Sequence, residues 1–307
     1  MPSRLTVLLV SLLLAAPALV FWLWLVIVPV RVAMLCPEEC RCDPGGIFVS
    51  CNGTSLNPIP LIHLTDVRIV LLIDNNITLL ERDSFVSVAE LEMLVVDRCG
   101  LRTIELGAFN WLSKLIALSI IENEISDLIP GTFENMNSLE TLSLLNNRLE
   151  RLDSDVFSGL VNLKKLILDE INLHYIHPDT FLMLPNPQYL HLSASGALQV
   201  PTDRHFINSH SLSHLGLSYC NISSLSVETF ANFSALEHLD LSGNYLKTVD
   251  INILRALPKL STLYLYGNPL QCDCQLQEVW RWCEERNIQT VDWGGVCRNV
   301  THRAKWS

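Results

Sequence analysis

Histidine and tyrosine gather in the last third of this chain, at spacings that suggest a shared surface. Tyr189, His214 and His238 follow one another at steps of 25 and 24 residues. With their near neighbours they form a group that comprises Tyr189, His191, His214, Tyr219, His238, Asp240, Tyr264 and Tyr266. Imidazoles can hold a metal ion or sense pH, whereas tyrosine supplies rigid amphipathic contact area and is enriched at binding hot spots. Because neither a cysteine nor a convergent set of carboxylates accompanies the histidines, we expect partner binding rather than metal binding.

The chain contains none of the motifs that position a catalytic nucleophile, a catalytic zinc ion or a nucleotide. It has no G-x-S-x-G, H-E-x-x-H, G-x-x-x-x-G-K-[ST] or G-x-G-x-x-G segment. We therefore expect no enzymatic activity and no cofactor. The net charge of −11 argues against a nucleic-acid partner.

A repeat of about 24 residues must position the tyrosines and histidines. Phenylalanine recurs at this interval, at Phe85, Phe109, Phe133, Phe157, Phe181, Phe206 and Phe230. A second pattern precedes it, clearest in Leu139-x-x-Leu142-x-Leu144-x-x-Asn147-x-Leu149. This is the leucine-rich repeat signature, and nine copies lie between residues 67 and 270. The predicted fold is an α/β-type solenoid, a leucine-rich repeat horseshoe with a parallel inner sheet of about nine strands.

Each position of the repeat has a predicted orientation. The fourth and sixth residues are apolar and two apart, so they point to one side of a short strand, toward the core. The third, fifth, seventh and eighth residues face solvent on the inner sheet. The ninth residue, usually asparagine, turns the chain and hydrogen-bonds to neighbouring backbone, and Cys99 and Cys220 replace it in two copies as buried thiols. The strands are predicted at 67–72, 91–96, 115–120, 139–144, 163–168, 187–192, 212–217, 236–241 and 260–265.

Two further features bear on where a partner binds. The solvent-facing positions of the N-terminal half are rich in apolar residues from Leu71 to Ile167, which form a second candidate surface. For both surfaces, β-propensity alone is the competing explanation. Copies five and six depart from the pattern, with Ile171 and Ser195 at the ninth position and Pro187 at the first. Either these copies have drifted, or they form a bend or bulge that aims the inner face at a partner.

Eight of the ten cysteines flank the repeats. The first cluster is Cys36-x3-Cys40-x-Cys42-x8-Cys51, and the second is Cys272-x-Cys274 with Cys283 and Cys297 beyond it. A solenoid must cover its open ends, and disulfides are the expected state in an oxidising compartment. A zinc site in the first cluster is the alternative. The predicted segments are a leader at 1–35, an N-terminal cysteine cap at 36–66, nine repeats at 67–270 and a C-terminal cysteine cap at 271–307.

The repeats with their flanking cysteines resemble the extracellular leucine-rich repeat family with cysteine caps, which includes Toll receptors, Slit, the insect adhesion proteins and the lamprey variable lymphocyte receptors. The resemblance implies the pairs Cys36–Cys42, Cys40–Cys51 and Cys272–Cys297. In this family the residue matching Cys274 pairs with a fourth cysteine, which here would lie beyond Ser307. We therefore expect an incomplete C-terminal cap, in which Cys283 is either the substitute partner of Cys274 or an extra thiol.

The N-terminus carries an export signal. An uninterrupted apolar run extends from Val7 to Val30, longer than the core of a typical secretory signal and long enough to span a bilayer. We expect a cleaved signal and a secreted protein. The alternative is an uncleaved anchor at the cell surface, which would be the protein's membrane contact. Five glycosylation sequons support export, at Asn52, Asn76, Asn221, Asn232 and Asn299.

The expected function is non-catalytic binding of an extracellular protein or glycan on the concave face. The family resemblance implies roles in adhesion, guidance or innate-immune recognition. One alternative is a structural matrix component, although the small matrix proteoglycans lack the Cys-x-Cys start seen at Cys272. Another alternative is the truncated ectodomain of a longer receptor.

Overall fold

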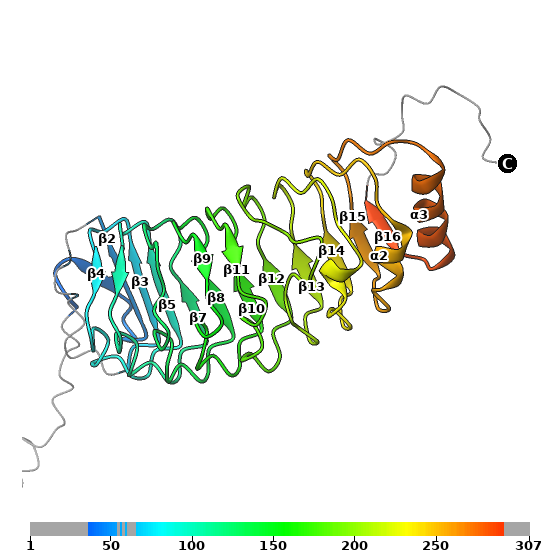
Figure 1. The fold of residues 1–307 in the computed structure, drawn as a ribbon. Coiled ribbons are helices and arrows are strands. Elements are labelled where there is room, and N and C mark those ends of the chain that lie inside the picture. The colour runs from blue at the N-terminus through cyan, green and yellow to red at the C-terminus, as the bar shows by residue number, and fades with distance from the viewer. Residues whose placement is uncertain (1–35, 54–55, 57–58, 60–65, 292–307) are drawn as a thin grey trace, which may run out of the picture. The chain divides into compact units, whose positions relative to one another are not determined.

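The computed structural model describes the chain apart from residues 1–35, 54–55, 57–58, 60–65 and 292–307. The repeats lie in one compact unit, residues 37–307 (Figure 1). Within that unit, short strands stack into one continuous sheet, and an outer segment connects each strand to the next.

The main sheet contains twelve strands, which follow one another in chain order. They are β1 (Cys40–Cys42), β2 (Phe48–Asn52), β3 (Ile69–Ile73), β5 (Met93–Asp97), β7 (Ala117–Ser119), β8 (Thr141–Ser143), β10 (Lys165–Ile167), β12 (Tyr189–His191), β13 (His214–Gly216), β14 (His238–Asp240), β15 (Thr262–Tyr264) and β16 (Gln289–Val291). The strands from β2 onward pair in parallel, whereas β1 and β2 are antiparallel.

This sheet confirms the predicted solenoid. The nine repeat strands, β3 to β15 in the main sheet, each begin two residues later than their predicted ranges. The sheet is larger than the predicted nine strands because β1 and β2 extend it at one end and β16 at the other. These additions supply hydrogen-bond partners to strands that would otherwise be open edges of the repeat stack.

The outer segments contain little regular structure. The strand β4 (Leu79–Leu80) pairs with β6 (Thr103–Ile104), and β9 (Arg151–Leu152) pairs with β11 (Tyr175–Ile176). The helical elements are η1 (Glu228–Phe230), α2 (Ile251–Arg255) and α3 (Cys274–Glu285). Among the residues described, no helix has both the length and the apolar character that crossing a membrane requires.

A column of phenylalanine rings fills the interior beside the leucines. The leucines at the fourth and sixth positions, such as Leu142 and Leu144, are fully buried. Five successive phenylalanines stack with ring centroids 6.0–6.2 Å apart, and they are Phe85, Phe109, Phe133, Phe157 and Phe181. Phe206 and Phe230 are also buried. The prediction of a buried phenylalanine column is therefore confirmed, with the ring stack continuous over five copies.

The ninth-position asparagines join consecutive repeats through buried hydrogen bonds. In the eighth copy, Asn244 Oδ1 accepts from the backbone N–H groups of Cys220 and Ile222, each at 3.0 Å. Its Nδ2 donates to the carbonyl oxygens of Leu217, Leu241 and Ser242 at 2.8–3.2 Å. One side chain thus satisfies five backbone groups from two repeats, which explains its recurrence in a region closed to water.

The two ninth-position cysteines form some of the same hydrogen bonds between repeats. The thiol of Cys99 donates to the carbonyl oxygen of Leu72 at 3.2 Å, and that of Cys220 donates to Leu192 at 3.1 Å. Both thiols are free and buried, as predicted. Burial raises the pKa of Cys220 to about 11 and also raises that of Cys99, so both stay protonated donors at neutral pH.

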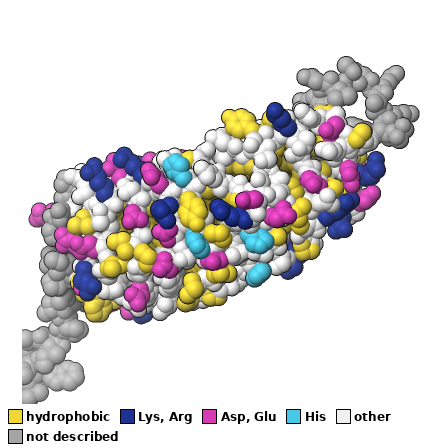
Figure 2. All heavy atoms as spheres, in the orientation of Figure 1, with side chains coloured by type: hydrophobic (Ala, Val, Ile, Leu, Met, Phe, Trp, Pro, Cys, Tyr) yellow, Lys and Arg dark blue, Asp and Glu magenta, His cyan; other side chains and the backbone are white. Residues whose placement is uncertain are grey.

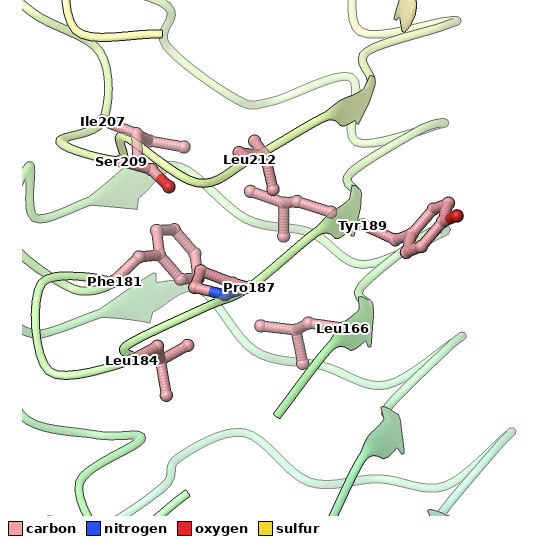
Figure 3. Close-up of a pocket in the computed structure, with 9 residues that line it drawn as sticks. Leu166, Phe181, Leu184, Pro187, Tyr189, Ile207, Ser209 and Leu212 are labelled. Carbon is pink, nitrogen blue, oxygen red and sulfur yellow. The ribbon is translucent and has the colours of Figure 1, made fainter. Parts of the chain in front are cut away.

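Copies five and six keep the inner sheet regular and place their irregularity in the outer segment. The register from β10 through β12 to β13 is unbroken, pairing Lys165 with Tyr189 and Tyr189 with His214. A bulge in the inner face is therefore wrong, whereas the alternative of a bend stays a prediction. The irregularity is instead a small apolar cavity on the core side of β12 (Figure 3). The volume that the centre of a water molecule could occupy in it is about 10 Å³. In Figure 3 the ring of Tyr189 points away from the other residues that line this cavity.

Two substitutions account for the cavity. Pro187 occupies a first position that holds leucine or valine in the other copies. Ser209 lies three residues after Phe206, where the other copies carry Val88, Leu112, Met136, Leu160, Leu184, Phe233 and Leu257. Within the described structure, the buried Oγ atom of Ser209 has no hydrogen-bond partner. A buried hydroxyl without a protein partner beside an apolar cavity weakens packing locally.

We expect Ser209→Val to raise the free energy of unfolding by about 1 kcal/mol, because it removes a buried polar atom and fills apolar space. Urea denaturation of the wild-type and variant proteins measures the change. Ser211→Val is the matched control, since Ser211 Oγ donates to the carbonyl oxygen of Pro187 at 3.0 Å and its loss should destabilise. A destabilised Ser209→Val would show that this cavity is hydrated rather than empty.

Candidate functional site

Three rings from neighbouring strands form a stack on the solvent side of the sheet. The first residues of β12, β13 and β14, which are the third positions of copies six to eight, are in register and place Tyr189, His214 and His238 side by side. The ring centroids of Tyr189 and His214 are 4.2 Å apart, and those of His214 and His238 are 4.0 Å apart. All three side chains are half-buried. Stacking holds each ring in one orientation, so this surface is ordered before any partner arrives.

A second row runs beside the stack at the fifth positions, through His191, Gly216, Asp240 and Tyr264. A Cβ atom added to Gly216 would lie 3.5 Å from His191 Nδ1, so the histidine ring leans over the glycine. Asp240 Oδ1 accepts from the backbone N–H of Ser242 at 2.9 Å and from its hydroxyl at 2.5 Å. The aspartate therefore keeps a defined position on the sheet.

Tyr219 and Tyr266 lie at the strand-end side of these rows and are exposed. The φ angle of Tyr219 is 55°, and φ is positive at the eighth position of all nine copies. Its ring lies against Gly243, where an added Cβ would meet ring carbons at 2.4–2.8 Å. The eight residues predicted from the sequence thus occupy four adjacent strands and their ends, and we call this surface the Tyr–His patch.

Sequence reasoning missed one exposed aromatic residue next to the patch. Tyr245 is 59% exposed and directly follows the ninth-position Asn244. Its backbone N–H donates to the carbonyl oxygen of Ile222 at 2.8 Å, which ties it to the preceding repeat. The tenth position was not treated as a contact position, although the tyrosine itself was a usable signal.

Burial and the neighbouring His238 favour the uncharged form of His214, because both lower its pKa. Burial lowers the pKa of His214, with a further lowering by His238, while Glu237 acts in the opposite direction. Beside the patch, burial raises the pKa of Asp169. Asp169 Oδ1 accepts from the backbone N–H of Ser193 at 2.6 Å, and its Oδ2 lies 4.0 Å from His191 Nδ1. In the part of the chain that is described, no three acidic, histidine or cysteine side chains form a metal-binding cluster.

The acidic residues of the N-terminal half are occupied by contacts within the protein. Arg98 pairs with Asp74 at 2.6 Å and lies 3.9 Å from Glu122. Asp97 Oδ1 accepts from the backbone N–H of Ile121 at 2.8 Å and from the Ser119 hydroxyl. Acidic and basic side chains also intermix over the face seen in Figure 2. This half therefore offers a partner less unpaired charge than its sequence suggests.

The N-terminal cysteines form the disulfide cap. The structure contains the Cys40–Cys51 bond that the family pairing implies. Cys36 and Cys42 are also disulfide-bonded, so this cluster is not a zinc site. Cys272 is disulfide-bonded as well, whereas its implied partner Cys297 lies outside the described residues.

The suggested pairing of Cys274 with Cys283 is wrong. Both are free thiols on the helix α3, the first exposed and the second buried. They are nine residues apart, so a rise of 1.5 Å per residue separates their Cα atoms by roughly 14 Å, too far for a disulfide. Cys283 packs into the core side of α3, and burial raises its pKa to about 11.

The predicted glycosylation sites differ in accessibility. Asn52, Asn76 and Asn221 are exposed, whereas Asn232 is half-buried and its amide donates to Asn208 Oδ1. Asn221 Nδ2 donates to the carbonyl oxygen of Gly196 at 2.8 Å, outside the two rows of the patch. Asn299 lies outside the described residues. Occupancy of these sites stays a prediction.

Known proteins resemble this chain over most of its length. Trophoblast glycoprotein of Macaca fascicularis is 26% identical over 262 residues, covering 82% of this chain and 60% of the relative. The solved structure of human 5T4, a trophoblast glycoprotein, matches with a TM-score of 0.59 at 25% identity, over 82% of this chain and 88% of the other. The FLRT2 repeat domain matches with a TM-score of 0.58 at 23% identity, over 83% of this chain and 92% of that one, which supports the fold.

The family comparison agrees with the repeats counted in the sequence. The leucine-rich repeat family model matches residues 89–149, 138–195 and 210–270. The chain spans less than two thirds of the length of the first curated relatives it matches. Its relatives are extracellular or cell-surface proteins of this repeat type, and none of these matches indicates a catalytic family. The chain belongs to the leucine-rich repeat family.

Proposed function

We propose that this protein is a non-catalytic extracellular binding protein that recognises a protein partner through the Tyr–His patch. The observation that carries the proposal is the ring stack of Tyr189, His214 and His238, ordered in the absence of a partner and continuous with the second row of the patch. Pre-ordered aromatic side chains lose little conformational entropy on binding and are typical of hot spots.

The relatives support binding as the function class. FLRT2 was solved in an octameric complex with Latrophilin 3 and Unc5D, so that repeat domain assembles with other extracellular proteins. The exposed sequons of this chain lie outside the two central rows of the patch, and glycans there would leave these rows open. By family resemblance, adhesion, guidance and innate-immune recognition are the settings we propose for this binding.

The patch tyrosines test the proposal. We expect Tyr189→Ala and Tyr264→Ala each to weaken binding by at least about tenfold, because central aromatic anchors commonly contribute 2 kcal/mol or more. A partner would first be captured by screening the secreted protein against an array of extracellular domains. Its affinity for each variant would then be measured by surface plasmon resonance.

Tyr175→Ala is the matched control. Tyr175 is comparably accessible, at 37% exposure, but lies on β11 outside the main sheet. It should leave affinity unchanged, and all three variants should keep the wild-type melting temperature. Patch variants that bind as tightly as wild type would move the site to the apolar half between Leu71 and Ile167. Patch variants that melt early would contradict the assignment of strand faces.

A further inference from the structure

We propose that the Tyr–His patch takes a basic side chain of the partner on the carboxylate of Asp240, and that protonation of the neighbouring histidines weakens this contact. The inference rests on the proposed function, because it names the chemistry by which the patch recognises its partner.

Asp240 is the single formal charge at the solvent-facing positions of copies six to nine when the histidines are neutral. Both of its hydrogen bonds, from the Ser242 backbone and hydroxyl, go to Oδ1. Among the described residues, Oδ2 of Asp240 has no hydrogen-bond or ion-pair partner. A half-buried carboxylate with a free oxygen forms its strongest hydrogen bond with a positively charged donor, and the side chain of arginine or lysine is such a donor.

The surroundings of Asp240 suit a flat or extended cation. Tyr264 stands beside it on β15, and His238 precedes it by two residues on the same face of β14. On the other side, its register partner is Gly216, which has no side chain to cover the carboxylate. A guanidinium group can pair with a carboxylate while it stacks on an aromatic ring, so this arrangement favours arginine.

The wider charge distribution agrees with a basic partner. In copy five, two acidic residues flank the patch, Asp169 and Glu170. One basic residue of the same copy, Lys165 on β10, lies next to Tyr189 of the patch. The whole chain carries a net charge of −11. Opposite charge across an interface steers the partner and sets its orientation, whereas an acidic partner would meet four carboxylates here, those of Asp169, Glu170, Glu237 and Asp240.

Acid should weaken such a contact through the histidine stack. The titratable and charged groups that face the stack are Lys165, Asp169, Glu170, Tyr189, His191, His214, Glu237, His238, Asp240 and Tyr264. Imidazole side chains in general take up protons as the pH falls from neutral toward 5. Each proton adds positive charge beside Asp240, which opposes a cation. Because the pKa of His214 is lowered, its proton is added late in this range.

A tripeptide pair tests the proposal without a known partner. The probe is acetyl-Gly-Arg-Gly-amide, and its control replaces arginine with citrulline, which has nearly the same shape but no charge. Binding to the secreted protein is followed by NMR at the amides of Asp240, Gly216 and Tyr264. At about pH 7.5 we expect saturable shifts with the arginine peptide and none with citrulline. At about pH 5.5, below the ordinary histidine pKa, we expect binding to weaken at least about threefold.

Variants assign the effect to named groups. Asp240→Asn keeps the acceptor for Ser242 and should weaken arginine-peptide binding about tenfold, the loss expected for one charge-assisted hydrogen bond. Asp127→Asn removes an exposed carboxylate outside the strands and should change nothing. Replacing His191, His214 and His238 together by glutamine removes the groups that take up protons, so the ratio of arginine-peptide affinities at about pH 7.5 and about pH 5.5 should fall to about one, whatever the affinity at the higher pH.

Three outcomes overturn the proposal. One is equal binding of the citrulline peptide or of Asp240→Asn, and another is no saturable shift with the arginine peptide. A third is binding of acetyl-Gly-Glu-Gly-amide that tightens in acid, which would identify an anionic ligand. None of these results affects the tyrosine test above, because loss of partner binding in Tyr189→Ala would still place the interface on this patch.

Discussion

Replacing Phe157 by alanine should lower the free energy of unfolding by about 3–5 kcal/mol, the usual cost of removing a buried aromatic ring. Phe157 is fully buried and stacks between Phe133 and Phe181, at centroid distances of 6.2 Å and 6.1 Å. Its loss opens a cavity between repeats that each contact only their neighbours, so the stack should weaken near its middle. Equilibrium urea unfolding of the secreted protein, followed by circular dichroism, measures the loss.

Phe157→Leu is the matched control, because it keeps most of the apolar volume and should cost much less, about 1–2 kcal/mol. Tyr264→Ala truncates a half-buried ring on the solvent face and should leave stability nearly unchanged. If Phe157→Ala cost no more than Tyr264→Ala, the phenylalanine column would not be a main stabilising element of the fold.

Replacing Asn244 by leucine should cost about 3–5 kcal/mol, since each buried polar group left without a partner costs about 1–3 kcal/mol. The substitution keeps a similar side-chain volume but removes the acceptor of the Cys220 and Ile222 N–H groups. It also removes the donor to three carbonyl oxygens. The same urea titration measures the change, and amide hydrogen exchange at Cys220 and Ile222 should accelerate with it.

Asn172→Leu is the control for this change, because Asn172 is exposed at the tenth position of copy five. It should alter stability by less than about 0.5 kcal/mol, as surface substitutions usually do. A cost below about 1 kcal/mol for Asn244→Leu would show that the slot needs shape rather than hydrogen bonds. Ile171, which fills the same slot in copy five, would then be its equivalent.

The repeat, the strand faces and the buried positions could be predicted because they follow from local periodicity. A strand alternates its side chains with a period of two, so a 24-residue pattern of leucines, asparagine and phenylalanine assigns each position to core or solvent. The prediction that Phe157 is buried and Tyr189 faces outward needed no more than that. The cysteine clusters likewise indicated a covered first end, since both the Cys40–Cys51 bond and the antiparallel strand β1 lie there.

Contacts between copies could not be predicted, because they depend on what stands at the same position one repeat away. The alternation of side chains places His191 and Tyr219 on the solvent side, but their ring positions depend on the bare backbones of Gly216 and Gly243 in the next repeat. The cavity behind β12 arises in the same way, from Pro187 and Ser209 meeting across two segments. A disulfide between Cys274 and Cys283 was one of the predicted alternatives, but both residues lie on the helix α3 and point to different sides of it.

The sequence by itself determined that this protein is a capped stack of leucine-rich repeats with a tyrosine- and histidine-rich stretch on its inner sheet. It could do so because each repeat contacts only its neighbours, so one repeated pattern specifies the whole stack. The tertiary structure alone decided that three of those rings stack at 4.0–4.2 Å, that the acidic residues Asp74, Asp97 and Glu122 are occupied internally, and that Asp240 keeps a free oxygen. The physical reason is that burial and periodicity are properties of single positions, whereas charge pairing and ring stacking are properties of neighbours about 24 residues apart.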